Sequence, residues 1–170
     1  MPVGEEELKS LSKEKLIEVI KMFSRNWNTL DGLWFLAVEE EFGFEAAASL
    51  DEKVWEIEPV IEAKRIKALL DLSGGGPDSV VRAIDFMTWA PSFEYTWEKR
   101  PGKIIWTCTK CPPQEARKRK GLPENTCKPM GINCFDGLVK VIDPSVKVNC
   151  LVCPPDPHKD NLWCQWEFIG

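Results

Sequence analysis

The hydrophobic pattern of this 170-residue chain changes period near residue 90, and that change limits the folds open to it. Before residue 90, large apolar residues recur every three or four positions, which is typical of helices that bury one face. After residue 90, apolar and polar residues alternate, which is typical of strands with one buried face. We therefore expect an α+β protein, with a helical N-terminal layer packed on a small, mostly antiparallel sheet that carries cysteine-rich loops.

The first half predicts several helices separated by glycine and proline. The longest apolar stripe follows Ser12, a fitting N-cap, and we expect this stripe to pack on another surface. Gly43 ends the first long helix, and a break or kink is expected at Pro59 in the next one. Pro77 opens a further helix. The stripe steps by four, three, four, three and four residues: Leu16, Ile20, Phe23, Trp27, Leu30 and Trp34.

The second half predicts about four short strands, with two helical stretches between the second and the third. Alternation places Cys108, Cys150 and Cys164 on the apolar faces of their strands. A sheet of this size needs the helices to cover it. We therefore expect one domain over residues 1–170, with a helical half at 1–90 and a half with the sheet and the cysteines at 91–170.

The sequence Cys-x-x-Cys-Pro-Pro occurs twice, at 108–113 and 150–155. Such a turn brings two sulfurs within reach of one ion, and the prolines stiffen the loop. Two such turns could close a four-thiolate site, which suits Zn²⁺ or, less often, iron. Cysteine is also a common core residue and a common catalytic or redox group, so these alternatives stay open.

His158 is the only histidine in the sequence, which excludes metal centres with several histidines. It lies five residues after Cys153 and six before Cys164, so it can orient over either sulfur. If the protein is an enzyme, Cys164 and His158 form the expected catalytic pair. The alternative is a loop histidine with no part in catalysis, and the sequence leaves open whether the protein is an enzyme at all.

Three segments resemble an uncharacterised cysteine-rich family of anaerobic bacteria and archaea: LDGLWFLAVEEEFGFEAAASLDEKVW, CPPQEARKRKGLPENTCKP and CLVCPPDPHKDNLWCQWEF. The thiols that recur in that family correspond here to Cys111, Cys127, Cys150, Cys153 and Cys164. Cys108 does not belong to the pattern. The resemblance thus implies a thiolate site with four metal ligands: Cys111, Cys127, Cys150 and Cys153. Cys164 would be a neighbour of this site, either as a further ligand or as a residue that lines the pocket.

The chain is also remotely similar to the L-2-amino-thiazoline-4-carboxylic acid hydrolase-like family. The likeness includes a Gly-x-Glu-Ala step at 43–46 and a late Cys-x-aromatic-x-Phe at 164–168. It would imply hydrolysis of a C–N bond in a small cyclic substrate. Cys150, Cys153 and the proline-rich loop around His158 are additions to that family's pattern.

Composition and charge exclude several classes of protein. A hydrophobic fraction of 44% and eight tryptophans are enough for a core, which excludes a disordered chain. An acidic N-terminus and the lack of any apolar run of about 20 residues argue for a cytoplasmic protein without a membrane partner. The net charge of −5 argues against nucleic acid. The segment 99–128 is locally basic, and its EARKRKG stretch is expected to be a solvated helix.

These observations favour a cytoplasmic metal-binding protein with a cysteine-thiolate site and an unspecified reaction. Zinc is the expected metal, with iron or an iron–sulfur centre as the alternative cofactor. The competing hypothesis is a metal-free cysteine hydrolase or thiol oxidoreductase that acts on a small molecule. The sequence makes no prediction about the oligomeric state.

Overall fold

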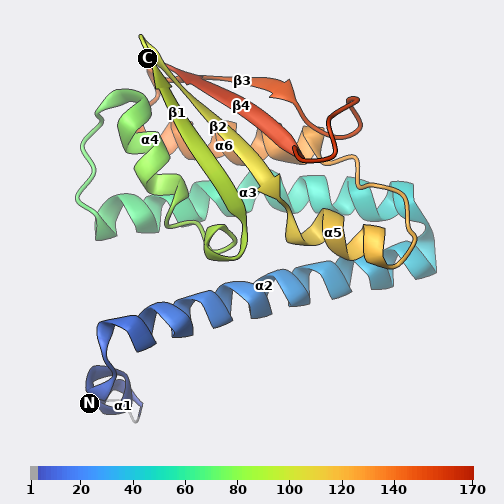
Figure 1. Cartoon of the computed structure of the whole chain (residues 1–170), viewed down its shortest axis with the longest axis horizontal. Helices are drawn as coiled ribbons and strands as arrows, with labels where there is room; N and C mark the ends of the chain where they lie inside the picture. The colour runs from blue at the N-terminus through green and yellow to red at the C-terminus, as the bar shows by residue number, and fades with distance from the viewer. Residues whose placement is uncertain (1–3) are drawn as a thin grey trace.

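The computed structural model describes residues 4–170 and confirms the α+β class (Figure 1). Within these residues one four-stranded antiparallel sheet accompanies six α-helices and a short 3-10 turn at Ala90–Ser92. The helices are α1 Glu5–Ser10, α2 Lys13–Phe42, α3 Phe44–Leu69, α4 Gly76–Ile84, α5 Pro112–Arg119 and α6 Lys128–Ile142. The strands are β1 Glu94–Arg100, β2 Lys103–Lys110, β3 Lys147–Val152 and β4 Cys164–Ile169.

Two long helices, α2 and α3, run antiparallel to each other below the sheet (Figure 1). α2 begins as predicted, because the Ser12 hydroxyl accepts a hydrogen bond from the backbone N–H of Lys15 at 3.2 Å. Gly43 separates the two helices with a φ of 86°, a conformation that favours glycine.

The break expected at Pro59 is absent, because α3 continues through this residue. Pro59 is buried where α6 crosses α3, and the close packing there offsets the backbone hydrogen bond that proline cannot make. Gly137 of α6 permits the close approach. A Cβ added at this glycine would lie 3.3 Å from Cγ2 of Val60 and 3.4 Å from Cβ of Pro59.

The strand order is β1-β2-β4-β3, and every neighbouring pair is antiparallel. Cys108 lies opposite Cys164, and Trp106 lies opposite Trp166, so these four side chains share one face of the sheet. Cys150 of β3 pairs with Trp166 across the other edge of β4, so its side chain points to the same face of the sheet. The alternation predicted for the three strand cysteines is therefore confirmed.

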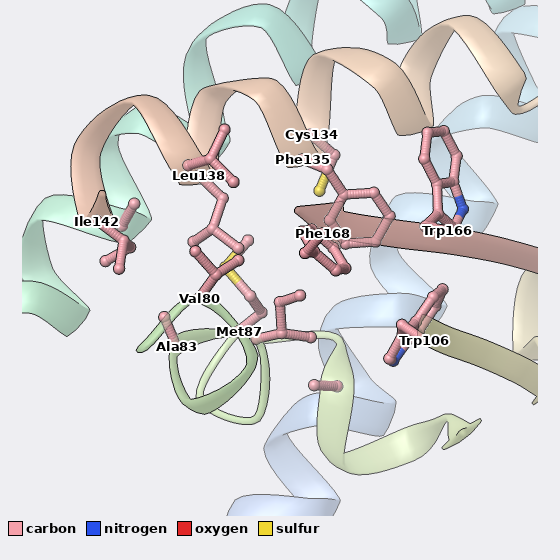
Figure 2. Packing of buried hydrophobic residues seen from close by; sticks show 14 of the residues in the cluster. Val80, Ala83, Met87, Trp106, Cys134, Phe135, Leu138, Ile142, Trp166 and Phe168 are labelled. Carbon is pink, nitrogen blue, oxygen red and sulfur yellow. The ribbon is translucent and has the colours of Figure 1, made fainter. Parts of the chain in front are cut away.

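The shared face of the sheet packs on α6 and α4 to form the core (Figure 2). Phe135 of α6 lies 5.0 Å from Trp166 and 5.4 Å from Phe168, measured between ring centroids. Leu138 of the same helix and Val80 of α4 have no exposed surface. Burial of this aromatic and aliphatic cluster is the main stabilising contribution to the fold.

Candidate functional site

Six of the seven cysteines gather at one end of the sheet, and we name this group the thiol cluster. β2 and β3 end there and β4 begins there, because neighbouring strands are antiparallel. α5 and α6 also begin there, each directly after a cysteine at its N-cap. The members of the thiol cluster are Cys108, Cys111, Cys127, Cys150, Cys153 and Cys164.

Cys108, Cys164 and Cys153 form the central row of the thiol cluster. Cys108 and Cys153 are both close enough to Cys164 to interact with its sulfur. Cys108 also contacts Cys111 and lies 3.4 Å from the carbonyl oxygen of Lys110. The sequence pattern had set Cys108 apart from the ligands, yet its fully buried side chain lies in the middle of the thiols.

Cys127 lies next to Cys153, and their Sγ atoms are 3.9 Å apart. Gln114, which is 1% exposed, fixes Cys127 by donating a hydrogen bond from Nε2 to its Sγ at 3.1 Å. The same amide is bonded to both backbone groups of Asn125, at 2.8 Å to the carbonyl and 2.9 Å from the N–H. α5 therefore holds the loop that carries Cys127 in place.

Hydrogen bonding among the thiols separates their proton affinities. The bonds from Cys108 and Cys153 hold the pKa of Cys164 well below that of a free thiol, although burial opposes this. Interactions with Cys111 and then Cys164, together with burial, raise the pKa of Cys108. Interactions with Cys127 and then Cys164, together with burial, raise the pKa of Cys153. Cys164 is therefore the thiol of the cluster that the surroundings favour as the thiolate.

Cys150 lies at the margin of the cluster, beside an ion pair. Burial raises its pKa to about 11, although the positive charge of Lys128 opposes this shift. The Lys128 ammonium binds the carboxylate of Asp156 at 2.7 Å, and Asp156 also accepts a bond from the backbone N–H of Cys153 at 3.3 Å. Together these two charges brace the loop that follows β3.

His158 is bonded to other groups than the thiols. Its Nε2 lies 3.1 Å from a Glu124 oxygen, and its Nδ1 lies 3.1 Å from the Lys159 carbonyl. Burial lowers the pKa of His158, but these bonds outweigh burial and leave the pKa raised. The imidazole is close enough to Cys164 for its positive charge to favour the thiolate. Its arrangement suits an electrostatic role better than proton transfer to a bonded sulfur.

A cavity of about 220 Å³ opens beside Cys127. Its wall combines the 125–130 segment with α3, and α3 contributes three carboxylates: Glu45, Asp51 and Glu52. An acidic lining favours the approach of cations. The cavity therefore gives a small cation a route toward Cys127.

The donor set suits a thiophilic metal, whereas the positions of the sulfurs suit it only in part. Two sulfurs of a tetrahedral zinc site are about 3.8 Å apart, given Zn–S bonds of about 2.3 Å. The 3.9 Å between Cys127 and Cys153 matches that spacing. However, no group of three or more Cys, His, Asp or Glu side chains within residues 4–170 is placed to hold a metal ion. Further thiols would have to turn toward this pair on binding.

The structure separates the seventh cysteine from the others. Cys134 lies on α6 in the core beside Phe135 (Figure 2). The sequence did not reveal that Gln114 bonds to Cys127 or that Asp156 pairs with Lys128, because these contacts join residues that share no periodic pattern.

Comparison with known proteins relates the chain to others only at the level of a family. No helix in residues 4–170 is long and apolar enough to span a bilayer. No curated protein and no solved structure matches the chain. A family of unknown function, DUF6125, matches residues 9–169. This confirms the expected membership of an uncharacterised family: the chain belongs to DUF6125.

Proposed function

We propose that this chain is a metal-binding protein whose thiol cluster holds a thiophilic ion, zinc in the first instance. The observation that supports the proposal is the gathering of six cysteines from three strand ends and two helix starts. Soft thiolates select zinc, copper(I) and iron–sulfur centres over hard cations. A cation would also neutralise the thiolate that the low pKa of Cys164 favours in this partly buried cluster.

The proposed ligands are Cys111, Cys127, Cys150 and Cys153, with Cys108 and Cys164 in contact with them. A closed set of four thiolates would make the metal structural, and an open position would let it activate a water or a substrate thiol. We place the protein in the cytoplasm, where reduced thiols are available for binding.

Calorimetric titration of the metal-free protein with Zn²⁺, without oxygen, tests the ligand assignment. Cys127→Ala and Cys153→Ala should each weaken zinc binding at least about 100-fold, because even changes behind the ligands cost about 10–100-fold. Cys134→Ala is the matched control, since it removes a buried thiol outside the cluster. Zinc binding that is equally tight in both cluster variants would refute the assignment.

A second candidate function is an enzyme that uses Cys164 as a nucleophile without a metal. The specific observation in its favour is the lowered pKa of Cys164, flanked by thiols that donate to it and by the charge of His158. The remote likeness to the thiazoline hydrolase-like family would make the reaction hydrolysis of a C–N bond in a small molecule. A thiol oxidoreductase would use the same sulfur with Cys108 or Cys153 as its partner.

Alkylation with iodoacetamide at pH 7, followed by peptide mass spectrometry, separates the two candidates. A nucleophilic Cys164 should be labelled at least about tenfold faster than Cys150, whose pKa is about 11. A metal-bound cluster should be protected throughout, and a chelator should remove the protection. Uniform slow labelling with and without the chelator would contradict both candidates.

A further inference from the structure

The apolar stripe of α2 is exposed along most of its length, although the sequence pattern predicts that it packs on another surface. Ser24 is the one buried residue that this 30-residue helix contributes. Four stripe residues expose more than half of their surface: Ile20 56%, Phe23 58%, Leu30 69% and Trp34 73%. A helix with a sustained apolar stripe of this spacing normally buries it against other helices.

α3 carries a second exposed stripe with the same spacing. Its members also step by four, three and four residues, so they lie on one side of the helix. They are Leu50 at 49% exposed, Val54 at 55%, Ile57 at 61% and Ile61 at 42%. Two antiparallel helices of one hairpin thus each present an unpaired seam of the kind that coiled coils and four-helix bundles bury.

The two stripes border one groove and therefore form one surface. A cavity of about 390 Å³ lies between the helices, and Leu30 and Trp34 of α2 face Leu50 and Val54 of α3 across it. The eight stripe residues are 42–73% exposed, so neither the sheet nor α6 covers this surface.

We infer that two copies of this chain associate through the α2–α3 hairpin and form a four-helix bundle in which α2 is antiparallel to the partner's α2. A two-fold interface brings the same surface of both copies together, so that surface must complement itself. The charge of α2 meets this requirement. Residues 13–27 hold four basic and two acidic residues, whereas residues 28–42 hold four acidic residues and no basic one. Glu39 is paired with Arg117 of the same chain, and Glu40 and Glu41 are exposed toward a partner.

The size of the surface agrees with a stable dimer. At roughly 100 Å² of exposed surface for each side chain, about half of what a large side chain presents when free, the eight stripe residues offer on the order of 800 Å². One partner in a standard interface buries about the same area. A lone charged ligand in the groove would leave Ile20, Phe23 and Ile61 exposed, whereas a second hairpin would cover them.

Two carboxyl groups that line the groove, Asp51 and Glu58, can be covered by a second copy of the chain at little cost. Burial raises the pKa of Asp51 and of Glu58 to about 7, and nearby carboxylates add to both shifts. Both groups therefore accept a proton near neutral pH, which lowers the cost of removing them from water. Arg65 lies near Glu58 and partly offsets its charge.

Sedimentation equilibrium of the full chain tests the inference. The wild-type protein should have twice the 19.4 kDa mass of the chain at micromolar concentration. Leu30→Lys with Trp34→Lys should raise the dimer dissociation constant at least 100-fold, while circular dichroism shows unchanged helix content. Leu151→Lys is the matched control, since this exposed leucine lies on β3 and should leave the dimer intact.

Charge exchange tests the antiparallel arrangement. Lys13→Glu with Lys15→Glu should weaken the dimer at least tenfold, and so should Glu40→Lys with Glu41→Lys. All four changes in one chain should restore most of the affinity, because both ends of the helix reverse sign together. A wild-type monomer at 100 μM, a dimer that resists Leu30→Lys with Trp34→Lys, or a fourfold variant without recovery would each overturn the inference.

Discussion

Gln114 shows how a single buried amide positions one sulfur of the thiol cluster. Its side chain is bonded to Cys127 and to both backbone groups of Asn125, so it joins α5 to the loop before α6. A buried amide is stable only when its donors and acceptor are paired, and here the pairing also fixes the loop. The place of Cys127 in the cluster thus depends on a residue that is not itself a candidate ligand.

Replacement of this amide by an apolar group should weaken both folding and metal binding. We expect Gln114→Leu to lower the free energy of unfolding by about 1–3 kcal/mol, since it leaves the Asn125 backbone groups unpaired. It should also reduce zinc affinity about tenfold, as changes behind a ligand commonly do. Urea unfolding and zinc titration measure the two effects. Gln165→Leu, at a half-buried bond to Thr107, is the control, and equal effects at both positions would contradict the account.

The predictability of single residues follows from whether their contacts are periodic. Alternation correctly placed Cys108, Cys150 and Cys164 on one face, because the period of a strand fixes the direction of each side chain. It could not show that Cys108 touches Cys111 and Cys164 at the centre of the cluster. Nor could it identify Gln114, whose partners lie across a turn with no repeating pattern.

Among the elements, α5 departs most from its expected character. Its charged sequence predicts a solvated helix, yet Arg117 is only 5% exposed. The guanidinium binds both oxygens of Glu39 on α2, at 2.5 and 3.0 Å, and lies over the rings of Phe35 and Phe44. One arginine in a run of four basic residues therefore ties α5 to α2, and composition alone could not identify which one.

The groove between α2 and α3 gives the protein a characteristic pH dependence. The pKa values of Asp51 and Glu58 are about 7 in the folded state and about 4 when exposed. The folded state therefore binds these protons more tightly, and the resulting stabilisation is fully present below about pH 4. It is lost as the pH rises through 7.

Neutral replacements of these two carboxyls should therefore stabilise the protein at high pH. Asp51→Asn with Glu58→Gln should raise the free energy of unfolding at pH 8 by about 1–2 kcal/mol, a value reduced because both groups are partly solvated. At pH 4.5 the gain should be much smaller. Chemical unfolding at several pH values measures this, with Glu56→Gln on the exposed side of α3 as the control. An equal gain in the free energy of unfolding at both pH values would show that burial does not disfavour the ionised form of these carboxyls.

At the scale of the whole molecule, the change of period near residue 90 predicted the arrangement well. The apolar face of the sheet needs a cover, and α4 from the helical half and α6 from the sheet half provide it together (Figure 2). The antiparallel order then brings the ends of β2 and β3 and the start of β4 to one place. The long α2 was predicted as a helix, but the surface on which its apolar stripe packs was not evident. We infer that this surface belongs to a second copy of the chain.

Metal analysis of the native protein is the sharpest test of whether the thiol cluster holds a metal ion. The whole chain should be purified without oxygen or added metal and examined by elemental analysis and absorption spectroscopy. We expect about one equivalent of zinc and no visible band. Iron with visible absorption would mean that the thiol cluster binds iron instead of zinc. Protein that is folded, fully reduced and free of any transition metal, and that also fails to take up added zinc, would contradict the claim.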